Sequence, residues 1–513
     1  MSSADGSVPK TTGAIDSSSQ LRWGVYTLLI SIAVGNMTGR LLAVNSVNRT
    51  DLQSHLIRQD LQRVEQKLKK KDLSAEQYQR ELEVAKARVL SNRQLERPFL
   101  SANDRSRWLA IRALVEHGSY EIDLVLDRHV WNSIDMVQHR GRDGELHLYS
   151  SKPPLLYTLL AGEYWLINKL TGMSLGSHPY VVGRLMLVTI NVLPMVLMFF
   201  VIAKLTERLG ATDWGRIFVV ASACLGTLLN SFAIVLNNHI VAAVSASLAL
   251  YALVRIWCDG ETRVRYYVAA GLCAAFTAAN ELPALAFLAL VGLALLTCDR
   301  RAWLQGFLPA AMLVVVAFFV TNYVAHNCLT PPYMHKESGD PEENWYNYTY
   351  TIGGVERESY WQNRQGIDQG EPSKSVYALH AFIGHHGIFS LTPVWLLSVA
   401  GILLWSRSGK SRQRWLAIGT ALLTCVCLVF YIMLRPQVDR NYGGMTCGLR
   451  WMFWFTPLWL LTMIPAADWF SRRRTRQAIA MCLLAFSVFS VSYPTWNPWT
   501  HPWLYRWLEY LAG

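Results

Sequence analysis

One carboxylate and three cations stand beside apolar segments, where they can act together on a charged substrate. Asp104 and Arg107 lie in a stretch that reads as an amphipathic helix over residues 104–118. Lys152 precedes two prolines, and Arg450 begins an apolar run. A carboxylate can take a proton from an attacking hydroxyl, and Lys and Arg match phosphate oxygens. The plainer alternatives are that Asp104 only caps its helix and that Lys152 is an ordinary interfacial lysine.

Other polar side chains between apolar runs are predicted to line the same cavity, because ionisable residues beside membrane spans are costly and often functional. They are Arg105, Tyr149, Asn238, His239, Glu281, His386 and Tyr442. The neighbouring His385 and His386 are expected to point apart, so no metal-ligand set is predicted. The sequence indicates no particular cofactor, and a role for a divalent cation stays open.

The elements that position these residues are predicted to be membrane helices. Hydrophobic residues make up 52% of the 513-residue chain and charged residues 16%, against about 25% charged in soluble domains. Its 20 Trp and 22 Tyr suit the membrane–water interface. Runs of about 20 apolar residues predict an all-α integral membrane protein, a polytopic bundle of roughly 10–12 transmembrane helices with juxtamembrane helices and an extracytoplasmic helical hairpin.

Apolar and polar segments alternate along the chain and divide it into seven parts. These are a disordered cytoplasmic tail (1–22), the first transmembrane helix (23–44), an extracytoplasmic loop (45–180) with a helical hairpin (51–95) and a juxtamembrane catalytic helix (104–118), a transmembrane bundle (181–325), a second extracytoplasmic loop (326–386), a second transmembrane bundle (387–491) and a Trp-rich interfacial tail (492–513).

Basic residues orient the predicted spans. Five alternate connections are rich in Arg or Lys, around residues 204–216, 255–265, 300–301, 407–414 and 472–476. Because cytoplasmic loops carry an excess of Lys and Arg, this side is predicted to be the cytoplasm. The formal net charge of +12 is divided among these clusters, so it does not predict a nucleic-acid partner.

Three short motifs resemble those of a known superfamily. Asp104, Arg107 and Trp108 match an external Asp-x-x-Arg-aromatic motif that follows the first span, and Lys152-Pro153-Pro154 matches a Lys-Pro-Pro element in the same loop. A late Gly-Gly…Gly-x-Arg stretch ends at Arg450. The chain is similar in these respects to the GT-C superfamily of membrane glycosyltransferases, especially the protein O-mannosyltransferase and lipid A aminoarabinose transferase branch.

The chain also departs from that pattern. Arg105 stands where many relatives have an acidic residue, and Glu281 stands about where the aminoarabinose transferases have a second Lys. These departures leave the sugar, the acceptor and any metal open.

The resemblance implies inverting transfer of a sugar from a polyprenyl-phosphate donor to a lipid, glycan or protein acceptor. Asp104 would be the general base, and Lys152, Arg450 and Arg107 would bind the donor phosphate. The implied location is the bacterial inner or cell membrane, among membrane lipids, with the active site on the extracytoplasmic face.

Two other functions stay open from the sequence. One is a transporter or flippase for a lipid-linked or anionic solute, and the other is a non-catalytic scaffold that holds partners through the hairpin. The enzyme hypothesis requires Asp104, Lys152 and Arg450 to converge on one cavity that opens laterally to lipid.

Overall fold

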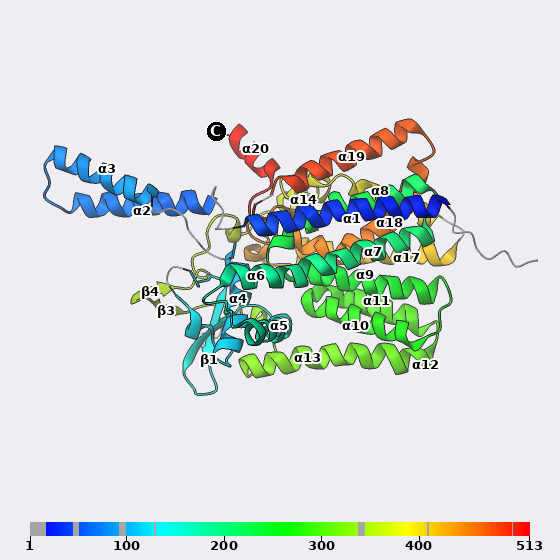
Figure 1. Ribbon diagram of the computed structural model, residues 1–513, viewed down its shortest axis with the longest axis horizontal. Helices are drawn as coiled ribbons and strands as arrows, with labels where there is room; N and C mark the ends of the chain where they lie inside the picture. The colour runs from blue at the N-terminus through cyan, green and yellow to red at the C-terminus, as the bar shows by residue number, and fades with distance from the viewer. Residues whose placement is uncertain are drawn as a thin grey trace, which may run out of the picture.

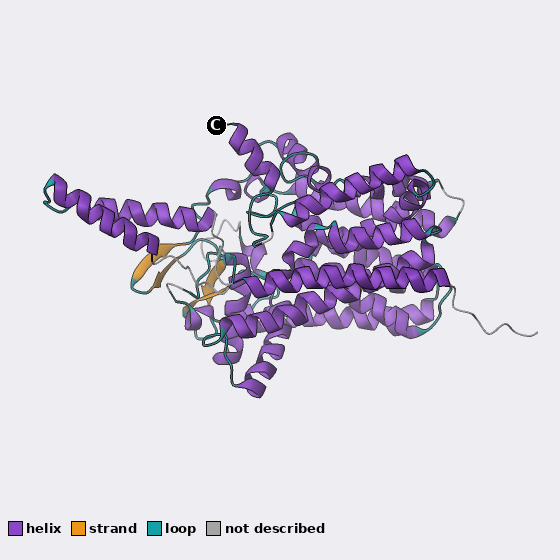
Figure 2. Cartoon of the chain, turned by 45° about the horizontal axis from the view of Figure 1, so that its top comes forward, coloured by secondary structure: helices purple, strands orange, loops and turns teal. Residues whose placement is uncertain are grey.

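The computed structural model describes residues 17–44, 51–91, 99–127, 130–336, 344–407, 410–494 and 496–512. It is 71% helical with almost no sheet. Most helices run side by side along the longest axis of the molecule (Figure 1). The remaining helices and the short strands lie toward one end of this bundle (Figure 2). This arrangement is consistent with the predicted all-α membrane protein.

The helical segments of the bundle alternate in direction along the chain (Figure 1). Their helices are α1 (Ser17–Ala43), α6 (Pro179–Leu187), α7 (Leu193–Leu209), α8 (Asp213–Leu225), α9 (Asn238–Trp257), α10 (Val264–Asn280), α11 (Leu285–Leu296), α12 (Arg300–Ala302), α13 (Leu308–His326), α16 (Trp395–Ser406), α17 (Ser411–Val429), α18 (Thr456–Phe470) and α19 (Arg474–Ser492). Within one segment each, α6 continues into α7 and α12 continues into α13.

The other helices and the strands are shorter or lie outside the bundle, mostly in the polar segments of the sequence. The helices are α2 (Asp51–Lys69), α3 (Ala75–Ser91), α4 (Ala102–Glu116), α5 (Pro154–Thr171), α14 (Lys374–Phe382), α15 (Ile388–Leu391) and α20 (Trp503–Leu511). Two antiparallel pairs of strands join them, β1 (Met136–Arg140) with β2 (Leu146–Ser150) and β3 (Thr349–Ile352) with β4 (Val355–Glu358).

Seven helical segments among the described residues are long and apolar enough to cross a membrane. They are Ser17–Ala43, Pro179–Leu209, Asp213–Ile234, Asn238–Trp257, Arg300–His326, Ser411–Leu434 and Arg474–Ser492. Two shorter apolar helices, Leu282–Leu296 and Trp395–Ser406, accompany them. The chain is therefore a membrane protein by length and composition of its helices, and the count of ten to twelve spans stays a prediction.

The first span begins earlier than the sequence indicates. Helix α1 starts at Ser17 rather than at residue 23, so residues 17–22 of the predicted tail are helical, and residues 1–16 lie outside the described part. The polar start is held by Arg22, which pairs with Glu207 and Asp213 at 2.8 Å each. A cation with two carboxylate partners lets a polar turn pack against neighbouring helices.

The basic connections gather at the end of the bundle where α1 begins. Arg208, in the last turn of α7, pairs with Asp259, which follows α9. The backbone N–H of Thr212 donates to Asp468 near the end of α18 at 2.9 Å. These contacts join two of the five connections that were predicted to be cytoplasmic to each other and to α18.

The loop 45–180 contains elements that the sequence analysis did not predict. The β1–β2 hairpin and the 18-residue helix α5 follow α4 within it. The proline pair begins α5, since proline is tolerated in the first turn of a helix. Residues 104–118 were predicted as the juxtamembrane helix, and α4 spans Ala102–Glu116 instead.

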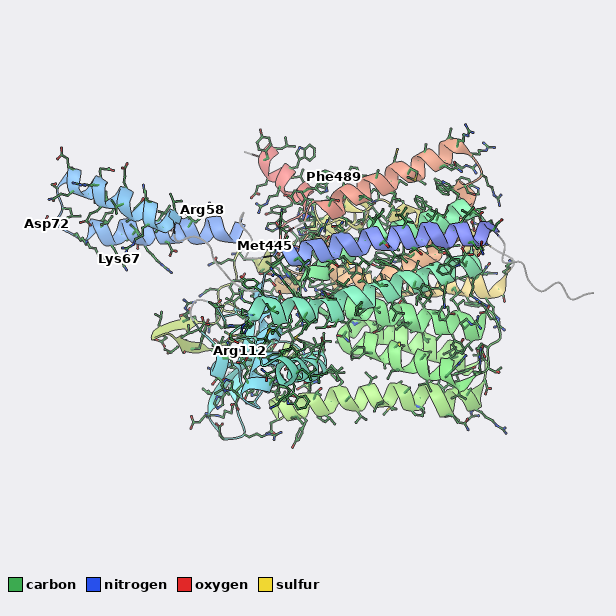
Figure 3. The ribbon with its side chains drawn as sticks, viewed as in Figure 1. Arg58, Lys67, Asp72, Arg112, Met445 and Phe489 are labelled. Carbon is green, nitrogen blue, oxygen red and sulfur yellow. The ribbon has the colours of Figure 1, made fainter. Side chains whose placement is uncertain are left out.

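Helices α2 and α3 form a pair that projects away from the bundle (Figure 1). Ser74 and Gln77 make the reciprocal capping bonds predicted for the start of α3. Arg58, Lys67 and Asp72 lie on this pair, beyond the end of the bundle (Figure 3). Residues 92–95 of the predicted hairpin lie outside the described part.

The orientation can be tested with two single-cysteine proteins in which the other cysteines are replaced. One retains Cys298, which is exposed between α11 and α12, and the other carries Lys67→Cys. In intact spheroplasts a membrane-impermeant maleimide should label position 67 at once and position 298 only after permeabilisation, because basic loops stay in the cytoplasm. The reverse pattern would contradict the predicted topology.

Candidate functional site

A cavity of about 430 Å³ lies where the polar segments meet the helices of the bundle. Arg107 of α4, Lys152 before α5 and Arg450 after the glycine-rich stretch all line it. Asn238, His239 and Glu281 line it as well. The structure therefore brings together six of the predicted site residues, which come from five separate parts of the sequence.

Hydrogen bonds and one ion pair connect the polar side chains of the cavity into a continuous set, which we call the cavity network. Its members are Asn103, Arg107, Asp135, Lys152, Asn238, His239, Glu281 and Arg450.

The network begins at Asp135, just before β1. Lys152 Nζ lies 2.5 Å from Asp135 Oδ2, which also accepts a 3.1 Å bond from Asn103 Nδ2. Ser151 Oγ donates to Oδ1 at 2.6 Å. Burial acts to raise the pKa of Asp135, but the charge and hydrogen bond of Lys152 outweigh it and the pKa stays lowered. Burial lowers the pKa of Lys152 to about 8, because Asp135 offsets only part of the desolvation.

Arg107 carries the network across the cavity. Its Nη1 donates to Asn103 Oδ1 at 2.6 Å, and its Nη2 donates to Asn238 Oδ1 at 2.7 Å. Asn238 Nδ2 in turn donates to Glu281 Oε1 at 2.9 Å. Burial lowers the pKa of Arg107 to about 10, and this cation remains charged at neutral pH.

His239 joins Glu281 to Arg450. His239 Nδ1 faces Glu281 Oε1, and Arg450 Nη1 lies 3.1 Å from His239 Nε2. Because arginine can only donate, Nε2 accepts and Nδ1 carries the proton, which assigns the tautomer from the network. Arg450 Nε donates to Gly443 O at 2.6 Å, so the glycine-rich stretch fixes the guanidinium.

Glu281 has one oxygen that the network does not use. Both of its recorded bonds, from Asn238 and His239, end on Oε1. No described residue donates a recorded hydrogen bond to Oε2, although Glu281 lines the cavity and is 6% exposed. Bonds to Oε1 therefore fix the position of this carboxylate, while Oε2 is available to accept a hydrogen bond from a ligand in the cavity.

A helix cap and a β-hairpin fix the positions of three members of the cavity network. Asn237 caps α9 by accepting a 3.0 Å bond from Ile240 N–H, so Asn238 and His239 stand in its first turn. The β1–β2 hairpin fixes Asp135, whose backbone carbonyl accepts a 2.6 Å bond from Ser106 Oγ of α4.

Asp104 was predicted to be the catalytic base in the cavity. In the structure it does not line the cavity. It is 1% exposed and lies on a narrow crevice of about 10 Å³. Its carboxylate accepts N–H bonds from Leu100 at 3.2 Å, Leu236 at 2.9 Å and the Trp108 indole at 2.8 Å. The helix cap is Ser101. Asp104 thus ties α4 to the segment before α9 and does not line the cavity.

Four other predicted residues lie outside the cavity. Arg105 is buried and donates to the carbonyls of Phe99 and Asn132. Tyr149 stacks on His139 with ring centroids 4.0 Å apart. His386 stacks on Tyr442 at 4.6 Å. Here His385 Nδ1 lies 2.5 Å from His386 Nδ1, so these neighbours face each other rather than pointing apart.

Sequence reasoning missed several polar residues of the cavity wall. They are Asn103, Asp135, Lys336, Arg435 and Asp439. Asp135 follows Ile134 and precedes Met136 and Val137, and a carboxylate in such an apolar setting was a usable signal. Arg435 and Asp439 are four residues apart, which is a common ion-pair spacing.

One wall of the cavity is apolar and reaches the outer surface of the bundle. Ala275 of α10, Leu288 of α11 and Phe318 of α13 contribute to it. Leu285 and Phe319 line the cavity and are also 51% and 43% exposed. An apolar path thus connects the cavity with the face that lipid would cover.

Among the described residues, no group of three or more His, Cys, Asp and Glu side chains is arranged to hold a metal ion. Comparison with known proteins finds no family model that matches the chain and no curated protein that is significantly similar to it.

The position of Asp104 predicts a pH-dependent stability. Burial raises its pKa from 3.8 to about 7, so its contribution is complete below the unfolded pKa and is lost as pH rises through about 7. Asp104→Asn turns an amide N–H₂ toward a backbone N–H and should lower stability by about 1–3 kcal/mol. Because the variant does not titrate, the Tm difference in detergent should be larger at pH 5 than at pH 8. A difference that grows with pH would contradict this assignment.

Proposed function

We propose that the protein is a membrane glycosyltransferase of the GT-C kind, which moves a sugar from a polyprenyl-phosphate donor to an extracytoplasmic acceptor with inversion. The observation that carries the proposal is the convergence of Arg107, Lys152 and Arg450 on one cavity with an apolar wall. The cations match a phosphate, and the wall matches a polyprenyl chain. The same arrangement supports an active site away from the basic connections, hence on the extracytoplasmic face.

The three cations would stabilise the leaving group. As the bond between the sugar carbon and the phosphate oxygen breaks, its electron pair stays with the phosphate and the negative charge there grows. Preorganised donors in a cavity of low dielectric stabilise such charge without reorganising during the reaction. The cavity network supplies this preorganisation, because Arg107 and Arg450 are already held by Asn103, Asn238 and Gly443.

We assign the general base to Glu281 in place of Asp104. The acceptor hydroxyl oxygen forms the new bond to the sugar carbon from the face opposite the phosphate, and its proton passes to Glu281 Oε2. Asp135 is a weaker candidate, because both of its oxygens are engaged by Lys152, Asn103 and Ser151. Glu281 also has His239 beside it, whose Nδ1 proton offsets the charge on Oε1.

The base assignment predicts a separation of activity from stability. Glu281→Gln should lower transfer from a radiolabelled polyprenyl-phosphate-sugar panel by about 100-fold or more, while Tm changes little, since the amide oxygen can still accept from Asn238. Asp104→Asn is the matched control and should lower Tm while folded protein retains most of its activity. Undiminished transfer by Glu281→Gln would remove Glu281 from the mechanism.

Lys152 predicts how donor binding depends on pH. With a pKa of about 8 in the folded protein, it loses its charge as pH rises from 7 to 9, and affinity for farnesyl phosphate should fall over that range. Lys152→Met should bind the ligand about tenfold more weakly at pH 7 and show less change with pH. Equal pH dependence in both proteins would exclude Lys152 as the titrating group.

A further inference from the structure

A second group of charges lies in the same cavity, on the side formed by the polar segments. Lys336 and Arg435 both pair with Asp439, and all three line the cavity. The Arg435 Nη2 to Asp439 Oδ2 distance is 3.2 Å. We call Lys336, Arg435 and Asp439 the outer charge group. None of its members belongs to the cavity network, although Arg435 and Asp439 lie in the same connection before α18 as Arg450.

The outer charge group has more positive than negative charge. Two cations share one carboxylate, and a third cation, Arg364, acts on Lys336 from nearby. Burial, opposed by Asp439, lowers the pKa of Lys336. Buried cations are costly unless paired. Among the described residues, Asp439 is the carboxylate recorded as pairing with Lys336 and Arg435, so an additional anion would be favoured there.

Aromatic rings surround the outer charge group. Lys336 Nζ lies 5.0 Å from the centroid of the Trp361 ring. The Arg435 guanidinium carbon lies 5.7 Å from the Trp451 ring and 5.8 Å from the Phe430 ring. Tyr346 and Tyr333 also line this part of the cavity. Rings beside hydrogen-bonding cations suit a sugar that bears an acidic substituent.

The outer charge group is held rigidly by contacts between two segments that are far apart in sequence. Arg364 Nη1 donates to Val438 O at 3.0 Å, and Glu371 N–H donates to Arg440 O at 2.9 Å. Gly370 has φ +76°, and a Cβ there would lie 1.8 Å from the carbonyl oxygen of Gln437. Only glycine permits this approach, so the site is preformed.

We propose that the outer charge group is the acceptor subsite, and that the acceptor is an acidic saccharide whose phosphate or carboxylate binds Lys336 and Arg435. This inference rests on the proposed function, because the cavity network is then occupied by the donor phosphate. The anion of the acceptor pairs with Lys336 and Arg435, which otherwise share the carboxylate of Asp439. The aromatic rings contact the sugar.

The test measures binding to the purified full chain in lipid nanodiscs, without catalysis. The acidic probes are glucuronic acid and glucose 6-phosphate, with glucose as the neutral control and farnesyl phosphate as a separate probe of the donor site. Wild type should bind each acid about tenfold more tightly than glucose, the usual size of one charge-assisted hydrogen bond. Saturating farnesyl phosphate should not displace the acids.

Variants separate the two sites. Lys336→Met should weaken the acids about tenfold and leave farnesyl phosphate unchanged, whereas Arg450→Met should do the reverse. Asp439→Asn should strengthen acid binding, since it frees both cations, and this opposite sign excludes misfolding as the cause. Lys374→Met is the matched control, because Lys374 donates to Met433 O outside the cavity.

The outcomes that overturn the inference are specific. Displacement of the acids by farnesyl phosphate would show that they occupy the donor site. If inorganic phosphate binds as tightly as glucose 6-phosphate, the sugar adds nothing to binding and the site is not specific for a saccharide. If farnesyl phosphate does not bind but Lys336→Met still weakens binding of the acids, the proposed function fails. The outer charge group would then remain a binding site for an acidic saccharide, without the role of acceptor subsite. Octyl glucuronide, compared with free glucuronic acid, distinguishes a membrane-anchored acceptor from a soluble one, and tight binding of either supports the subsite.

Discussion

The structure of the site depends on burying three cations at one end of a helical bundle. Arg107, Lys152 and Arg450 are each at least partly removed from water, and desolvation of a charge costs several kcal/mol unless partners compensate. The cavity network supplies the partners in a fixed order, from Asp135 through two asparagines to Glu281 and His239. Positive charge is thereby retained in a place where it can act on a substrate.

This constraint explains why the site requires so much of the chain. Asn103 and Arg107 come from α4, Asp135 from the approach to β1, Asn238 and His239 from the first turn of α9, and Glu281 from the turn after α10. The partners of each cation include a residue from another segment, such as Asn238 for Arg107, Asp135 for Lys152 and His239 for Arg450. The β1–β2 hairpin and α5, which were predicted as part of a loop, hold Asp135 and Lys152 next to each other.

Composition and periodicity were enough to predict a helical membrane protein, and short motifs identified Arg107, Lys152 and Arg450 as cavity residues. These sequence patterns did not predict which polar side chains of a helix face the cavity, because that depends on the direction of each side chain. Asp104 and Arg107 are three residues apart on one helix, yet Asp104 faces Leu236 and Arg107 faces Asn238. Asp135 and Asp439 were missed because Asp135 meets Lys152 only through the β1–β2 hairpin, and Asp439 meets Lys336 only across two different loops. Such pairings arise only from tertiary structure.

The projecting pair of helices α2 and α3 has a mechanical consequence. Nineteen residues of α2 at 1.5 Å per residue give a rod of about 28 Å, and an ion pair between Glu65 and Lys86 braces it across to α3 at 3.8 Å. A rod of that length is comparable to the hydrocarbon thickness of a bilayer. The projecting pair (Figure 1) is therefore about as long as a bilayer is thick, and it would meet a partner at a distance from the bundle rather than against it.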